Sequence, residues 1–164
     1  GEGMSLRGAS TANSLIVSRN SGISGYFNRN DNGSVLSFRR SGTEEGNISV
    51  TTTSASFNSV SDYRLKENVT YDFDATTRLK QLKPARFNFI ADADTTVDGF
   101  LAHEVQSIVP EAITGTHNEV DADGNPVYQG IDQAKLVPLL VKSLQEALAE
   151  IDTLKTKVAA LENA

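Results

Sequence analysis

The segment Ser61-Asp62-Tyr63-Arg64-Leu65-Lys66 carries a hydroxyl and an amine five positions apart. A serine hydroxyl is a poor nucleophile near neutral pH unless a base removes its proton. A lysine serves as that base only when desolvation or nearby cations lower its pKa, and Arg64 is such a cation. When a serine attacks the carbonyl carbon of the preceding residue, the attack closes a five-membered ring. Ser61 Oγ therefore needs only a backbone twist to reach the Val60 carbonyl. The segment permits self-cleavage, although surface loops often contain Ser and Lys at this spacing.

His103 and Glu104 are further candidates for this chemistry. A neutral His103 can orient a water or donate to a developing oxyanion, and Glu104 can hold Arg64 or Lys66 electrostatically. The alternative for His103 is an ordinary half-buried helical histidine, and for Asp62 it is a turn or capping residue. With no Cys and two His in the chain, we expect no disulfide, no metal site and no cofactor.

Composition and charge change near residue 60. Residues 1–60 carry five Arg and four acidic residues, whereas residues 61–164 carry ten basic and seventeen acidic residues. The net charge of −6 argues against a nucleic-acid binder that works by neutralising phosphates. The apolar runs are too short for a membrane span, and the first residues lack the charged and apolar regions of a secretion signal.

Short β-type runs separated by turn formers dominate the first sixty residues. They are Leu15-Ile16-Val17, Tyr26-Phe27, Val35-Leu36-Ser37-Phe38 and Ile48-Ser49-Val50. A segment so rich in Ser, Asn, Gly and Thr cannot build a core from one chain, so a stable structure needs strands from neighbouring copies. The alternative is a disordered linker.

Residues 61–132 have the pattern of a compact α+β unit. Asp74 can cap a short helix over 76–82, which Pro84 separates from a strand over 85–90. Apolar residues from 100 to 109 fall at helical spacing, and Pro110 ends that run. We interpret Asp121 to Pro126 as a turn between strands near Ile113 and Tyr128, because the glycine is misplaced for a calcium loop and the distal glutamate is absent.

Residues 133–164 form a predicted coiled-coil helix with four heptads. Positions a and d are Val137, Leu140, Leu144, Ala147, Ile151, Leu154, Val158 and Leu161. Opposite charges flank this seam at g and the following e, as with Glu150 and Lys155. The alternative is one long helix packed on its own domain, which the wider apolar stripe before Leu148 also suits. The seam permits two or three strands, so the oligomer number stays open.

Several ordered motifs between residues 61 and about 161 resemble one family, the C-terminal intramolecular chaperone or self-cleaving peptidase domain of bacteriophage tail fibres and endosialidase tailspikes, also found in myelin regulatory factor. The motifs are Ser61-Asp62-Tyr63-Arg64-Leu65-Lys66-Glu67-Asn68-Val69; Leu79, Leu82, Pro84 and Phe87-Asn88-Phe89; Gly99-Phe100-Leu101-Ala102-His103-Glu104-Val105; Val109-Pro110-Glu111-Ala112; and Leu136-Val137-Pro138-Leu139-Leu140-Val141-Lys142.

The resemblance implies an intertwined β-rich trimeric stem over 1–60, a chaperone and autoprotease core over 61–132, and a coiled coil over 133–164. It implies cleavage between Val60 and Ser61, with Ser61 as nucleophile, Lys66 as general base, and His103 and Glu104 in support. We expect the closing trimer to desolvate Lys66. The expected partners are two further copies and the upstream stem in cis, with any host glycan or receptor bound only through the parent fibre. A virion tail fibre, assembled in the bacterial cytoplasm, is the expected location.

Two rival functions remain. The first is a trimerisation or receptor-binding module that does not cleave, in which Ser61 and Lys66 are surface residues. The second is a polysaccharide depolymerase domain, which the sequence favours less because no pair of carboxylates stands out from ordinary surface acids.

Overall fold

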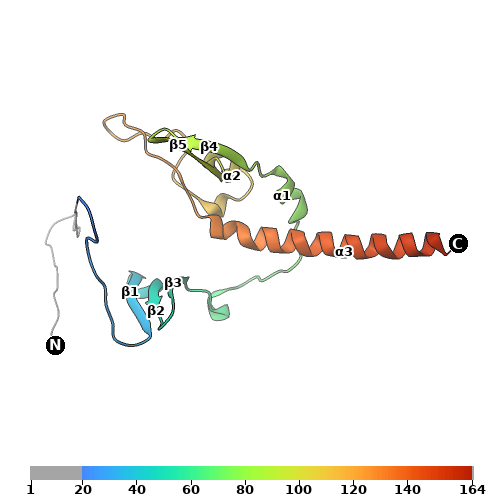
Figure 1. Ribbon diagram of the computed structural model, residues 1–164, viewed down its shortest axis with the longest axis horizontal. Coiled ribbons are helices and arrows are strands. Elements are labelled where there is room, and N and C mark those ends of the chain that lie inside the picture. The colour runs from blue at the N-terminus through green and yellow to red at the C-terminus, as the bar shows by residue number, and fades with distance from the viewer. Residues whose placement is uncertain (1–19, 164) are drawn as a thin grey trace. The chain divides into compact units, whose positions relative to one another are not determined.

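The computed structural model describes residues 20–163. They divide into two compact units between Val69 and Thr70, and Figure 1 shows the elements of each. The protein is a mixed α and β chain that ends in a long helix. The predicted strand Leu15-Ile16-Val17 lies outside the described residues. Over the described part of the chain, no helix combines the length and the apolar character needed to cross a membrane.

The first unit contains one antiparallel sheet in the order β1-β2-β3, with β1 over Gly33–Arg40, β2 over Thr43–Val50 and β3 over Ala55–Ser59. The first two strands contain the runs predicted at 35–38 and 48–50. The strand expected at Tyr26-Phe27 is absent: that stretch has no regular structure. β3 was not predicted, because its sequence ASFNS has only one large apolar side chain; its pairing with β2 makes it a strand.

This sheet has little interior of its own. Among the described residues of the first unit only Gly46 is buried, and a Cβ there would meet the Asn58 carbonyl oxygen at 2.6 Å. The Phe38 and Phe57 rings contact each other with centroids 5.7 Å apart, yet Phe57 stays 72% exposed. The sheet therefore leaves apolar side chains exposed in a single chain.

The second unit holds the hydrophobic core. Its elements are α1 (Thr76–Gln81), β4 (Ala85–Phe89), β5 (Asp92–Gly99), α2 (Ala102–Gln106), β6 (Ile113–Thr114), β7 (Gly130–Ile131) and α3 (Val137–Glu162), with short 3-10 helices at Pro110–Ala112 (η2) and Gln133–Leu136 (η3). A further 3-10 helix, η1 (Tyr63–Leu65), belongs to the first unit. β4 pairs with β5 and β6 with β7, both antiparallel. The buried core residues are Ala75, Leu82, Val105, Val109, Ala112, Leu136 and Leu139.

Local sequence signals explain several of these elements, but they predict no strand over 92–99, where β5 lies. Asp74 Oδ1 accepts from the Thr77 N–H at 3.1 Å at the start of α1, although Ala75 occupies the N-cap position. The helix predicted over 100–109 is shorter, because only 102–106 are helical, and Pro110 opens the 3-10 helix η2. The turn at 121–126 is confirmed: the Asp121 carboxylate accepts from the N–H groups of Asp123 and Asn125 at 2.9 and 2.8 Å. The following strand is Gly130–Ile131 and does not include Tyr128.

Helix α3 packs on the second unit only near its start. Leu136 and Leu139 enter the core, and Thr76 donates from N and Oγ1 to Glu146 Oε2 at 3.3 and 2.5 Å, which joins α1 to α3. Every residue after Glu146 in the helix is exposed. The a and d side chains Ile151, Leu154 and Val158 are 46%, 48% and 51% exposed. The sequence alternative of a helix packed along its whole length on its own domain is therefore wrong for the second half.

Ser143 gives a stability prediction. Its side chain is 5% exposed, and its Oγ is buried without a hydrogen-bond partner among the described residues. A buried polar atom without a partner is costly, and Ala is a better helix former than Ser. We expect Ser143→Ala to raise the free energy of unfolding by about 1 kcal/mol, measured by urea unfolding at fixed chain concentration. Ser107→Ala is the control, because the Ser107 hydroxyl donates to the Glu104 carbonyl at 3.2 Å. An unchanged or lower stability of Ser143→Ala would contradict the prediction.

Candidate active site

The backbone on both sides of the Val60–Ser61 bond is held by defined hydrogen bonds. On the amino side, β3 ends at Ser59, and the Val60 N–H donates to the Glu45 carbonyl at 3.1 Å, which continues the pairing with β2. On the carboxyl side, Asp62 caps the 3-10 helix η1 and its Oδ1 accepts from the Arg64 N–H at 2.9 Å. The bond therefore lies between a strand and a capped turn.

The turn brings the two predicted catalytic side chains together. The Lys66 N–H donates to the Tyr63 carbonyl at 3.1 Å, so the chain folds back by one 3-10 turn. Lys66 Nζ then donates to Ser61 Oγ at 2.7 Å. A nucleophile and a base within hydrogen-bond distance is the geometry that proton transfer from a serine requires.

Asp62 and Arg64 form a two-point ion pair beside this contact. Arg64 Nε donates to Asp62 Oδ1 at 2.9 Å and Nη2 to Oδ2 at 2.8 Å. The hydrogen bonds from the Arg64 side chain, then its backbone N–H, hold the pKa of Asp62 below its usual value, and Lys66 adds a smaller effect in the same direction. The same pair raises the pKa of Arg64. Asp62 thus caps η1, which was the alternative to a catalytic role in the sequence analysis.

The lowered pKa of Asp62 predicts that its titration midpoint depends on Arg64. A depressed carboxyl pKa means that the Asp62–Arg64 contact is present above the usual value of 3.8 and is lost only as the pH falls through the lower value in the folded chain. We expect Arg64→Gln to raise the Asp62 midpoint in a carboxylate NMR titration, because the largest cause of the shift is removed. The Asp98 midpoint, which Arg86 lowers in the second unit, is the control and stays in place. An unchanged Asp62 midpoint would contradict this.

Solvent reaches the Ser61–Lys66 contact in a single chain. Both residues are exposed, and the side chains of Tyr63 and Leu65 in the same turn are 81% and 71% exposed. The first unit by itself therefore does not provide the desolvation of Lys66 that the sequence argument requires.

His103 and Glu104 lie on α2 in the second unit. Glu104 Oε1 forms an ion pair with Lys83 Nζ at 3.2 Å, so its observed partner is neither Arg64 nor Lys66. The imidazole of His103 stacks on that of His117, with ring centroids 4.6 Å apart and an interplanar angle of 7°. His103 is exposed, so the alternative of a half-buried helical histidine is wrong. Sequence reasoning missed His117, because it follows no motif or periodicity. No group of three His, Asp or Glu side chains within residues 20–163 could hold a metal ion.

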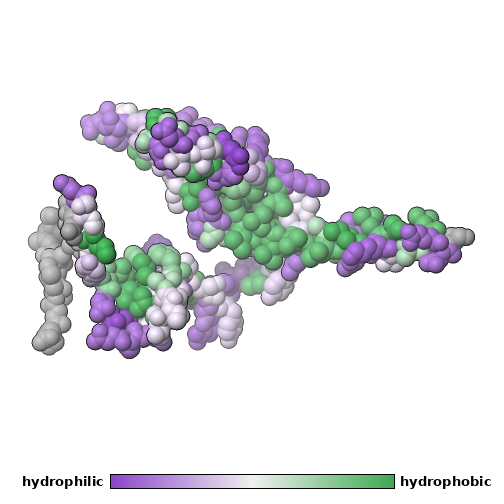
Figure 2. Space-filling model, viewed as in Figure 1, coloured by the Kyte–Doolittle hydropathy of each residue, from purple (hydrophilic) through white to green (hydrophobic). Residues whose placement is uncertain are grey.

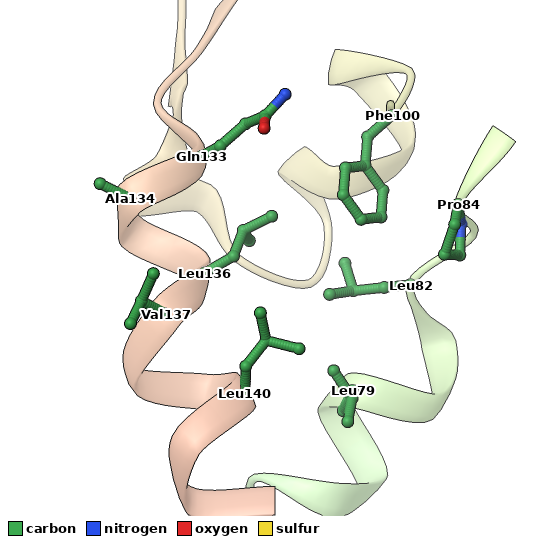
Figure 3. A pocket seen from close by; sticks show the side chains of 9 residues that line it. All are labelled: Leu79, Leu82, Pro84, Phe100, Gln133, Ala134, Leu136, Val137 and Leu140. Carbon is green, nitrogen blue, oxygen red and sulfur yellow. The ribbon is translucent and has the colours of Figure 1, made fainter. Parts of the chain in front are cut away.

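An apolar pocket of about 550 Å³ lies where α1 meets the start of α3. Figure 3 shows Leu79 of α1 and Leu82, which follows that helix, facing Leu136 and Leu140, with Phe100 closing one side. In Figure 2 hydrophobic surface covers the second unit at the start of α3 and continues in places along the helix. Val137 and Leu140 line the pocket and are also seam positions, each about half exposed. The pocket and the heptad seam therefore share Val137 and Leu140.

Residues 61–114 match the sequence profile of the Peptidase S74 family, described as "Chaperone of endosialidase". The expected family resemblance is confirmed over this segment. The match begins at Ser61, runs from η1 to β6 and includes Lys66, His103 and Glu104. The family description indicates a chaperone role, and the family name a domain related to serine peptidases. No curated protein matches the chain at a significant level.

Proposed function

We propose that the chain is the end of a phage tail fibre or tailspike, with the last part of its stem over 1–60 and a C-terminal intramolecular chaperone over 61–164. Within the chaperone, 61–132 are the core and 133–164 the coiled-coil helix. Three copies associate through α3, and the upstream stem folds in register. The chaperone then cuts itself off between Val60 and Ser61.

The contact between Lys66 Nζ and Ser61 Oγ at 2.7 Å is the observation that carries this proposal. By itself a serine and a lysine in contact at a surface mean little. Here the serine is the first residue of the chaperone match, and it directly follows a strand whose pairing extends to Val60. The position that separates stem from chaperone is thus the position that holds the nucleophile.

The cleavage proceeds as an acyl shift followed by hydrolysis. Ser61 Oγ loses its proton to neutral Lys66 and bonds to the Val60 carbonyl carbon. The C–N bond then breaks, and Lys66 returns the proton to the departing Ser61 amine. Water hydrolyses the resulting ester, which leaves a Val60 carboxylate and regenerates the Ser61 hydroxyl. His103 supports this sequence by orienting the water or donating to the oxyanion, with Glu104 beside it.

Assembly controls the reaction in this proposal. Lysine accepts a proton only when neutral, and desolvation favours the neutral amine. The exposed Tyr63, Leu65 and Tyr71 and the exposed seam of α3 are apolar surfaces that a second and third copy would cover. Cleavage therefore waits for the trimer. Loss of the chaperone then removes the route by which the stem could unwind, so the virion fibre gains kinetic stability.

Ser61→Ala tests the proposed function. We expect the wild-type chain, synthesised in a bacterial host, to run as two fragments on a denaturing gel. Ser61→Ala should stay full length and still assemble, because the methyl group cannot attack. Ser59→Ala, two residues earlier in β3, is the matched control and should be cut like the wild type. A Ser61→Ala chain cut at the wild-type rate would overturn the proposal, and a wild-type chain that assembles as one uncut band would favour the module that does not cleave.

A further inference from the structure

The two histidines of the chain meet although fourteen positions separate them. His103 belongs to the short helix α2, and His117 to the loop between β6 and β7. Their rings are nearly parallel, with centroids 4.6 Å apart and an interplanar angle of 7°. Parallel rings at this distance are a favourable aromatic arrangement, and each ring limits the rotation of the other.

Fixed backbone supports both rings. Next to His103 on α2, Val105 is 1% exposed and anchors the helix in the core. His117 lies in a turn that two hydrogen bonds between Thr116 and Glu119 close. The Glu119 N–H donates to the Thr116 carbonyl at 3.3 Å, and Glu119 Oε2 accepts from the Thr116 N–H at 3.1 Å. Gly115 enters this turn with φ +83°, a conformation that suits glycine. Two hydrogen bonds between Thr116 and Glu119 thus hold the turn that carries His117.

A second contact joins the same loop to the same helix. Gln129 Nε2, at the far end of the loop, donates to Gln106 Oε1 on α2 at 3.0 Å, in a partly buried position. The loop therefore contacts α2 at two points, His117 near its start and Gln129 near its end. One pocket lies between them and is lined by both histidines, Glu119, Tyr128 and Gln129 among others.

We propose that His117 is a positioning residue for His103. Its ring covers one face of the His103 imidazole and holds that imidazole in the orientation in which it supports cleavage. This inference rests on the proposed self-cleavage, and it adds a residue outside the matched segment, which ends at Thr114. His117 touches no reacting atom in this account and acts only through His103.

Three variants of the full chain test the role in cleavage. Appearance of the fragment 61–164 is timed after synthesis in a cell-free extract. We expect His117→Ala to slow cleavage roughly two- to tenfold, the effect of losing one aromatic pair. His117→Phe, which keeps a flat ring without ionisable nitrogens, should restore the rate to within about twofold of the wild type. Tyr128→Ala, which removes an exposed ring from the same pocket, should leave the rate unchanged.

An NMR measurement separates positioning from a general loss of structure. The chain has two His, so the imidazole spectrum of the uncut Ser61→Ala chain contains two sets of signals. His117→Ala should remove one set and shift the His103 set as the ring current of the stacked neighbour disappears. In His117→Phe the aromatic ring remains, so the His103 signals should stay away from the position that they take in His117→Ala.

The outcomes are distinguishable. If the wild-type chain is cut and His117→Ala is cut equally fast, or if His117→Phe is as slow as His117→Ala, the positioning role is overturned while the proposed function stands. An unchanged His103 signal in His117→Ala overturns the stack itself. A wild-type chain that assembles and is never cut overturns the proposed function, and the role of His117 falls with it.

Discussion

Lys66→Met is expected to reduce the rate of self-cleavage by about 10²- to 10⁴-fold, the usual contribution of a general base. Methionine has a similar length and no basic nitrogen, so Ser61 Oγ loses the partner that Lys66 Nζ provides at 2.7 Å. Lys66→Arg should fail as well, because a guanidinium stays protonated at any pH compatible with folding. Lys66→Arg keeps the positive charge but cannot accept a proton, so it separates a role of Lys66 in proton transfer from a purely electrostatic role.

The measurement is the fraction of full-length chain on a denaturing gel over time after synthesis. Lys80→Met, a change of an exposed lysine on α1, is the control and should be cut like the wild type. Lys66→Met should still assemble at the wild-type size in sedimentation. Cleavage of Lys66→Arg at the wild-type rate would contradict the role of Lys66 as base.

The second large effect is expected at the seam of α3. Leu154→Glu places a charge at a d position that is 48% exposed in the single chain and would be buried between helices in the trimer. Burial of a leucine stabilises by about 1.5–3 kcal/mol, and a charge in its place adds a desolvation cost in every copy. We expect the chain to sediment as a monomer at micromolar concentration and to remain uncut.

Ala149→Glu is the matched control for the seam. It adds the same charge at an f position, which faces away from the a and d seam, so association and cleavage should both persist. Sedimentation reports the oligomer, and a denaturing gel of the same sample reports cleavage. A monomeric Leu154→Glu chain that is cut at the wild-type rate would show that the trimer is not what activates Lys66.

The sequence predicts the elements whose pattern is local. The heptads predict α3, Asp74 and Pro84 mark the two ends of α1, and the motifs around Ser61 and His103 point to the matched family. β3 escaped prediction because its strand character comes from pairing with β2 and not from its own side chains. Helix α2 is shorter than its apolar spacing suggests, because Phe100 and Ile108 pack against the core from outside the helix.

The candidate site was predictable in its residue types but not in its contacts. A spacing of five positions does not say whether two side chains meet; the 3-10 turn capped by Asp62 brings Lys66 to Ser61. Glu104 was expected to hold Arg64 or Lys66, yet Arg64 forms its ion pair with Asp62, and Glu104 forms its ion pair with Lys83. The His103–His117 stack depends on how a loop folds, and no pattern in the sequence encodes it.

The proposed function requires the assembled chain to cut its own backbone between Val60 and Ser61. Mass spectrometry of the purified assembly, combined with sequencing of the amino terminus of the larger fragment, tests it most directly. The account predicts two species, one ending at Val60 and one beginning with Ser61. A single intact mass from a properly assembled trimer, or a new amino terminus at any other residue, would contradict it.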